Sequence, residues 1–153
     1  MVTLSPDRYA GILRVRLQER DTLRGQLAQL IRRLNALQSE RREIEATRIT
    51  ALQNQQRVRN RSLSITSLQT AAEHQRHLQQ TAERLAASQQ RVAQQLPPLQ
   101  KALQQADQQV AAIEKLIERE KLRRAQQAIH EESIAQDTAA MAKFYRERQR
   151  QQG

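Results

Sequence analysis

The stretch LQTAAEHQRHLQQTAERLAASQQRVAQQLPPLQKALQQADQQVAAIEKLI, residues 68–117, repeats one pattern along its whole length. Steps of three and four residues lead from one apolar side chain to the next, and only Gln75 and Gln89 are polar. A seven-residue repeat of this kind keeps a narrow apolar seam turned toward a partner helix, as in a left-handed coiled coil. The seam positions are Leu68, Ala71, Gln75, Leu78, Ala82, Leu85, Gln89, Val92, Leu96, Leu99, Leu103, Ala106, Val110, Ile113 and Ile117.

Pro97 and Pro98 interrupt the middle of this stretch. Each proline lacks an N–H group and disfavours helical geometry at the residue before it. The register nevertheless passes through both prolines unchanged, from Leu96 to Leu99. The register favours a kink or short break in one rod, and the alternative is two shorter helices in a three-helix bundle.

A second seam lies upstream, and Pro6 suits the first position of the helix that would carry it. This seam also contains arginines, whose stems can lie along apolar surface while their charged heads reach water. Its positions are Tyr9, Leu13, Arg16, Arg20, Leu23, Leu27, Leu30, Leu34, Leu37, Arg41, Ile44 and Arg48, with a shift near Ile49 and Leu52.

Between the two seams, residues 60–67 alternate Ser and Thr with apolar side chains, and such residues compete with helical hydrogen bonds. The sequence therefore predicts an all-α fold, a long antiparallel two-helix coiled-coil hairpin within a single unit, residues 1–153. We expect helix one over about 6–60, the turn over about 61–67 and helix two over about 68–149. Tyr9 then lies opposite roughly residue 119, and the last ~30 residues extend past the N-terminus.

The composition excludes most other classes of protein. With two Tyr, one Phe, no Trp and three Gly, the chain lacks the large core side chains and turns of a β or α/β domain. The absence of Cys removes disulfides and thiolate chemistry. The N-terminus does not resemble a signal peptide, and no segment approaches the ~20 apolar residues of a membrane span. We expect a soluble cytoplasmic protein without direct membrane insertion.

No motif for catalysis is present. The isolated glycines form no phosphate loop, and no nucleophile or paired carboxylates converge in a pocket. His74 and His77 lie three residues apart, but the facing helix offers them only Arg and Gln, so we expect no metal site. The sequence predicts neither an enzyme nor a cofactor.

The net charge of +10 suggests an acidic partner: nucleic acid, a membrane surface or an acidic protein. Residues 1–60 carry 12 basic and 6 acidic groups, residues 61–106 carry 5 and 2, and residues 107–153 carry 9 and 8. The excess is therefore spread over two thirds of the chain.

Binding of single-stranded nucleic acid normally needs aromatic side chains on which bases stack, and a zipper-type DNA-binding protein needs one continuous basic helix. Binding to a membrane would require an exposed apolar face, but the apolar face of each helix packs against the other helix of the hairpin. Protein interfaces are favoured, with a basic nucleic-acid-binding coiled coil and a structural rod as alternatives.

Two stretches resemble the flagellar FliJ family. The first, RYAGILRVRLQERDTLRGQLAQLIRRLNALQSE (residues 8–40), has the family's aliphatic pair, Ile12 and Leu13, followed by Arg14 and Arg16. The second, EKLIEREKLRRAQQAIHEESIAQDTAAMAKF (residues 114–144), matches the family's closing segment at Glu132, Asp137 and Ala140, whereas Thr138 replaces an acid. The YscO-like proteins of injectisomes are similar in size and design, so the sequence leaves the two export systems open.

The resemblance implies a non-enzymatic stalk of type III protein export. Its two ends would sit in the hole of a hexameric export ATPase and promote assembly and turnover of that ring. The hairpin tip would reach the export gate, a membrane protein, from the cytoplasm, and export chaperones are further implied partners. The residues expected to bind the ATPase are Leu13, Arg14, Arg16, Arg119, Arg123, Arg124 and Ile129, and those expected to bind the gate are Leu63, Ile65, Leu68 and Ala72.

The hairpin places Leu13, Arg14 and Arg16 near the region of residues 119–124. Glu19, Glu118 and Glu120 are the closest acids in sequence, and we expect them to be too few to neutralise the arginines. Unpaired arginines would be available to a carboxylate-bearing partner.

Overall fold

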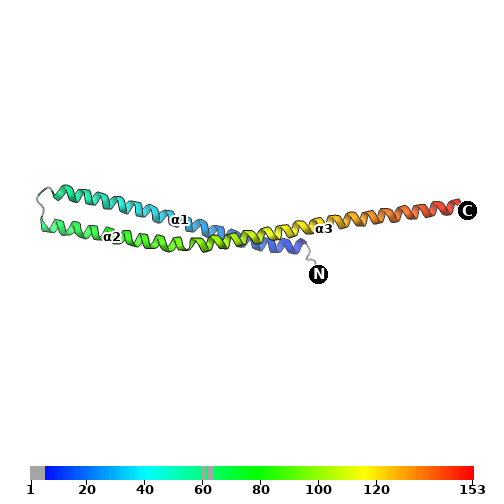
Figure 1. Cartoon of the computed structure of the whole chain (residues 1–153), viewed down its shortest axis with the longest axis horizontal. Coiled ribbons are helices and arrows are strands. Elements are labelled where there is room, and N and C mark those ends of the chain that lie inside the picture. Colours follow the sequence, from blue (N-terminus) through cyan, green and yellow to red (C-terminus); the bar gives the residue numbers. More distant parts are fainter. Residues whose placement is uncertain (1–5, 60, 62–63) are drawn as a thin grey trace. The chain divides into compact units, whose positions relative to one another are not determined.

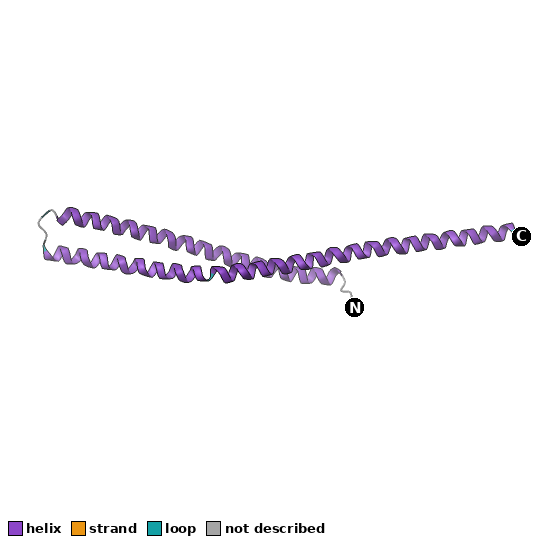
Figure 2. Cartoon of the chain, in the orientation of Figure 1, coloured by secondary structure: helices purple, strands orange, loops and turns teal. Residues whose placement is uncertain are grey.

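The computed structural model describes residues 6–59, 61 and 64–153. These residues form three helices, α1 (Pro6–Arg59), α2 (Ile65–Gln94) and α3 (Leu96–Gln151), and contain no strand (Figure 2). On the two sides of the turn, α1 and α2 run side by side in opposite directions (Figure 1). The predicted all-α helical hairpin is therefore confirmed.

The turn is bounded by a hydrogen bond on one side and a cap on the other. After α1 ends, the N–H of Arg61 donates to the carbonyl of Val58 at 3.1 Å. Ser64 is extended, with φ −70° and ψ 149°, and its hydroxyl accepts a hydrogen bond from the N–H of Ser67 at 3.3 Å. This N-cap lets α2 begin at Ile65 rather than near Leu68, because it satisfies a helical N–H that would otherwise lack a partner.

The second half of the hairpin bends at Gln95, just before the two prolines. Pro97 and Pro98 have no N–H groups, so the carbonyls of Ala93 and Gln94 lose their usual donors four residues ahead. The helix ends there, and the N–H of Gln95 instead bonds to Val92 at 3.1 Å. Gln95 keeps a right-handed helical conformation, with φ −79° and ψ −16°. Since prolines are tolerated in the first turn of a helix, α3 starts at once at Leu96.

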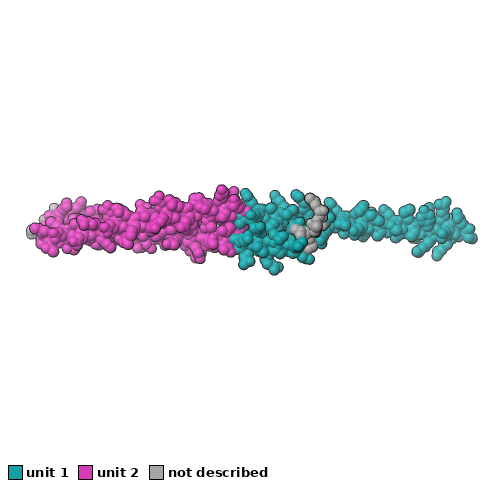
Figure 3. Space-filling view, turned by 90° about the horizontal axis from the view of Figure 1, so that it is seen from below, with its two compact units in different colours: residues 1–19, 106–153 teal, residues 20–105 magenta. Residues whose placement is uncertain are grey.

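The chain divides into two compact units (Figure 3): unit 1 comprises residues 1–19 and 106–153, and unit 2 comprises residues 20–105. In unit 2, α1 packs against α2 and the start of α3, and Leu78 and Val92 are buried. In unit 1, the start of α1 packs against α3, where Val110 is only 3% exposed. Among the described residues the deeply buried apolar side chains are few, as expected for a seam between two helices.

The residues at the predicted seam positions are buried nearly as expected. Every position of the register from Ala71 to Ile117 is buried or half-buried, and only Leu68, at its start, is exposed. On α1 the seam shifts beyond Arg48, where Ala51 and Gln55 take the half-buried positions in place of Ile49 and Leu52.

Arginines of the α1 seam reach glutamines on the facing helix. In unit 2, Nη1 of Arg41 donates to Oε1 of Gln89 at 3.2 Å. In unit 1, Nη1 of Arg16 donates to Oε1 of Gln109 at the same distance. A glutamine can accept this bond without neutralising the guanidinium, so the hairpin keeps its positive charge.

None of the helices in the described ranges combines the length and apolar content that a membrane span requires.

Candidate functional site

The first candidate surface lies where the start of α1 meets α3, within unit 1. Leu13 is half-buried and borders the same groove as Ile117, Glu118 and Lys121 of α3. Arg16 bonds to Gln109 and also forms an ion pair with Glu19, with 3.0 Å between Nη1 and Oε2. Because antiparallel helices advance at the same rate, this register brings Arg119 beside the first turns of α1.

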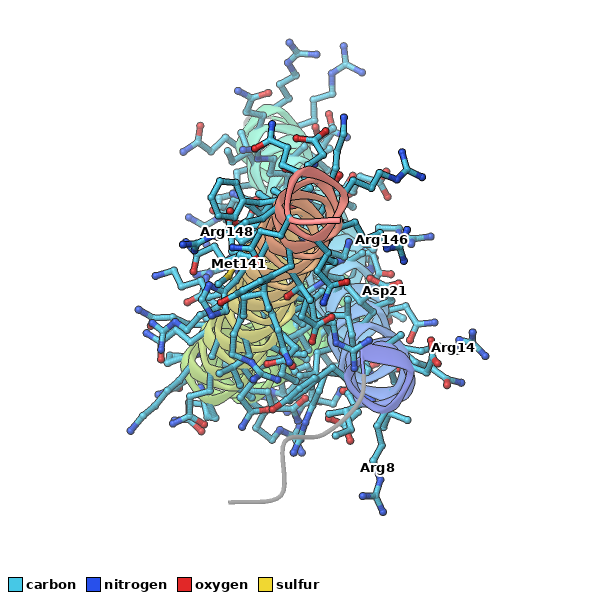
Figure 4. The ribbon with its side chains drawn as sticks, turned by 90° about the vertical axis from the view of Figure 1, so that its right-hand side faces the viewer. Arg8, Arg14, Asp21, Met141, Arg146 and Arg148 are labelled. Atoms are coloured by element: carbon cyan, nitrogen blue, oxygen red, sulfur yellow. The ribbon has the colours of Figure 1, made fainter. Side chains whose placement is uncertain are left out.

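Two of the expected arginines extend into solvent. Arg14 and Arg119 are both exposed, and neither has an ion pair among the residues that the structure describes. Figure 4 shows Arg14, like Arg8, extending outward from the start of α1. These two guanidinium groups fit the prediction of arginines open to a partner.

Arg123 and Arg124 form an acid–base cluster with Glu120. Arg123 donates twice, from Nη2 to Oε1 at 2.7 Å and from Nε to Oε2 at 3.2 Å, and Arg124 approaches Oε1 at 3.7 Å. Two of the three acids expected nearby therefore pair with arginines: Glu19 with Arg16, and Glu120 with both Arg123 and Arg124. The spacings of three and four residues put each pair on one face of its helix.

The cluster alters the electrostatics of both partners. The hydrogen bond from Arg123 is the main reason why the pKa of Glu120 lies below its ordinary value, and the same bond raises the pKa of Arg123. The Glu120 side chain is only 12% exposed, whereas both arginine side chains remain about half exposed. A partner could therefore reach the arginines while Glu120 stays covered.

Beyond Glu120, α3 has no packing partner in the described chain. Every residue from Lys121 to Gln151 is exposed, including Ile129 at 67%. Of the apolar side chains in this part of the helix, only Ile129 was expected among the binding residues, although apolar residues continue off register, with a stutter after Ile129, as far as Tyr145. The other large apolar side chains exposed here are Leu122, Ile134, Met141, Phe144 and Tyr145.

The second candidate surface is the turn end of unit 2. Ile65, the first residue of α2, is 76% exposed, and Ala72 is also exposed. Leu68 borders a groove of about 290 Å³ between α1 and α2, which stays open because Ala51 and Ala71 are small. Leu63, the fourth expected gate residue, lies outside the described residues.

His74 borders the same groove. Across the part of the chain that the structure describes, no group of three or more His, Cys, Asp or Glu side chains could hold a metal ion.

Comparison with known proteins returns one family. The model of the family described as "Flagellar FliJ protein" matches residues 6–149, which is nearly the whole chain. No curated protein and no solved structure matches the sequence.

Proposed function

The chain belongs to the flagellar FliJ family, whose members are components of flagellar type III protein export, and we propose that it is a central-stalk protein of that apparatus. In this role it catalyses no reaction itself. It binds a hexameric export ATPase through unit 1, favours the assembled ring and raises its turnover, and it contacts the export gate through the turn end of unit 2. It therefore acts in the cytoplasm, peripheral to the inner membrane.

The observation that carries the proposal is the unpartnered part of α3. A helix of this length with six large apolar side chains exposed needs an external surface to cover them. A ring that encloses the helix would cover all of its faces, whereas a flat partner would cover one. The six apolar side chains gather on one side of α3 and supply the apolar part of the contact, and the exposed remaining faces of the helix leave room for a ring to enclose it.

The arginines supply the polar part of the same contact. Arg14 and Arg119 can bind carboxylates directly, because no ion pair within the described chain has to be broken first. Arg123 and Arg124 share one carboxylate, so their remaining donors are open to a second acceptor. Arg16 is engaged by both Glu19 and Gln109, and its part is to hold α1 in register beside α3.

The gate contact rests on Ile65, Leu68 and Ala72, with Leu63 as the fourth residue taken from the sequence alone. The exposed Ile65 and the open groove beside Leu68 support an apolar contact there. Export chaperones remain further candidate partners, without residues assigned to them.

Stimulation of the ATPase tests the proposal. Arg14, Arg123 and Arg124 are replaced together by Glu, and ATP turnover by the isolated export ATPase is measured with each chain added. We expect the triple variant to lose stimulation while its circular dichroism stays that of the parent, because the three side chains are exposed. Charge reversal at Arg32, Arg33 and Arg42, which are exposed on α1 within unit 2, is the matched control and should still stimulate.

If the parent chain fails to stimulate the ATPase, the stalk function is wrong. If the triple variant stimulates as well as the parent, the arginines are not the contact, and the apolar residues Leu13, Leu122, Ile129 and Ile134 have to carry it.

A further inference from the structure

The positive charge is distributed unequally between the two units. Unit 2 contains 14 Arg and Lys against 6 Asp and Glu, a net charge of +8, whereas unit 1 contains 12 against 10, a net charge of +2. Export-ATPase binding, as proposed above, uses unit 1. The larger charge of unit 2 is therefore not explained by that role.

The excess is most marked at the turn. From Ala46 to Ala72 the sequence has no Asp or Glu. Arg57 and Arg59 lie in the last turn of α1 and Arg61 follows it, and all three are exposed without an ion pair in the described chain. We call these three residues the arginine collar.

Apolar side chains lie next to the arginine collar. Ile65 is four residues from Arg61, so their Cα atoms are at most about 15 Å apart. Val58, between Arg57 and Arg59 in the sequence, is 42% exposed, and Leu68 is 38% exposed. Val58 and Leu68 border the groove between α1 and α2 and are partly covered there, whereas Ile65 is largely uncovered. The turn end thus combines exposed apolar side chains with three arginines that have no ion pair in the described chain.

We propose that the turn end of the hairpin binds the surface of a membrane that contains anionic phospholipids. The arginine collar contacts headgroup phosphates, for which the planar guanidinium is well suited. Ile65 enters the boundary between headgroups and acyl chains, a depth that needs no membrane-spanning segment. This surface goes beyond the proposed stalk role and does not require the export gate.

The small area of the arginine collar and Ile65 suits a fluid lipid surface, whereas the gate contact proposed above also uses the side of α2 through Leu68 and Ala72. The ends of two helices, each about 10–12 Å wide, offer roughly 200 Å², whereas a standard protein interface covers about 800 Å² on each partner. A protein would need the sides of the helices as well, while a fluid lipid surface needs no shape complementarity.

Nucleic acid fits the same surface poorly. All three aromatic residues of the chain, Tyr9, Phe144 and Tyr145, belong to unit 1, so no stacking platform accompanies the collar. Bound to a phosphate backbone, the turn end would also leave Ile65 in water.

Flotation of the full chain with vesicles tests the proposal. The vesicles consist of phosphatidylcholine alone or of phosphatidylcholine mixed with phosphatidylglycerol, and we expect binding to the mixture only. Arg57, Arg59 and Arg61 are replaced together by Gln. Because each arginine near an anionic surface contributes about fivefold to partitioning, the triple variant should bind roughly a hundredfold more weakly.

The control removes the same charge elsewhere in unit 2, through Arg32→Gln, Arg33→Gln and Arg42→Gln. These residues lie at least 15 positions from Arg57, or about 22 Å along α1, which exceeds the Debye length of about 8 Å at physiological salt. The control should therefore bind nearly as the parent does. Ile65→Ser should weaken binding, whereas Ile31→Ser, at an exposed residue in the middle of α1, should not.

Three results would overturn the proposal. One is equal flotation with and without phosphatidylglycerol. Another is an equal loss of vesicle binding in the collar and control variants, which would show that only the total charge of the chain matters. The third is that the chain fails to bind vesicles of either composition but binds a duplex oligonucleotide, and that the collar variant loses this oligonucleotide binding. None of these results bears on ATPase stimulation, so the stalk function and this inference fail separately.

Discussion

At the scale of single residues, the arginines differ in how they are held. Arg16 and Arg41 bond to glutamines across the seam, Arg123 and Arg124 share a carboxylate, and Arg14 has no ion pair in the described chain. Sequence alone could not sort them, because the outcome depends on which side chains the hairpin register and the rotamers bring together. The spacings of Glu120 to Arg123 and Arg124, and of Arg16 to Glu19, were the available signals, and they indicated ion pairs on a helix.

The lowered pKa of Glu120 leads to a prediction about how the stability of the fold depends on pH. Because its pKa is lowered in the folded chain, the ion pair stabilises the fold above the ordinary carboxyl pKa, and this contribution is lost as the pH falls through the lowered value. In Glu120→Gln this part of the pH dependence should be missing. Thermal unfolding followed by circular dichroism from neutral to acidic pH measures it, and Glu118→Gln is the control. Identical pH profiles for the parent and Glu120→Gln would contradict the prediction.

At the scale of the elements, the heptad pattern located the seam better than the helix ends. From Ala71 to Ile117 every side chain at seam spacing is buried or half-buried, so this part of the seam could be predicted from the sequence. The start of α2 could not, because Ser and Thr are equally typical of a turn and of an N-cap. The effect of the prolines was also ambiguous from the sequence. They end α2 because hydrogen bonds are lost, yet they fit the first turn of α3, so the heptad register of the seam continues from α2 into α3.

The cap of α2 can be tested directly. Ser64→Ala removes the hydroxyl that accepts the N–H of Ser67, and loss of such a cap costs about 1 kcal/mol. We expect a lower thermal midpoint, measured by circular dichroism, and recovery in Ser64→Asp, which can accept the same bond. Thr66→Ala, an exposed neighbour one residue into α2, is the control and should change the midpoint much less. Equal shifts in Ser64→Ala and Thr66→Ala would rule out a specific role for the cap.

At the scale of the whole molecule, the hairpin register makes a testable prediction within unit 2. Leu30 and Pro98 border one groove, so spin labels at these positions should lie within about 20 Å, given helix axes 8–10 Å apart. The absence of natural Cys allows the two labels to be attached at introduced cysteines. A second pair at positions 30 and 74 should be about 36 Å apart, because the residue opposite His74 is roughly 24 positions from Leu30. Similar distances for the two pairs, measured by pulsed electron paramagnetic resonance, would exclude the antiparallel register.

The other prediction at this scale concerns the part of α3 that has no packing partner. Removing residues 125–153 takes away exposed surface and no part of the buried seam, since the last half-buried residue of α3 is Glu120. The thermal midpoint of the hairpin should therefore remain close to that of the parent. Stimulation of the export ATPase should be lost, because Ile129, Ile134 and the three large apolar side chains that follow are removed together.

A substitution separates the loss of apolar contacts from the loss of length. Ile129→Ser with Ile134→Ser keeps the whole helix and should weaken stimulation, whereas Ile49→Ser with Leu52→Ser removes two exposed apolar side chains from α1 in unit 2 and should not. A large drop in the thermal midpoint of the truncated chain would mean that residues 125–153 pack against the rest of the molecule. If the truncated chain melts as expected but stimulates the ATPase fully, then the exposed half of α3 is not the contact, and the ring has to be held by Leu13, Arg14 and Arg119 at the point where α1 and α3 meet.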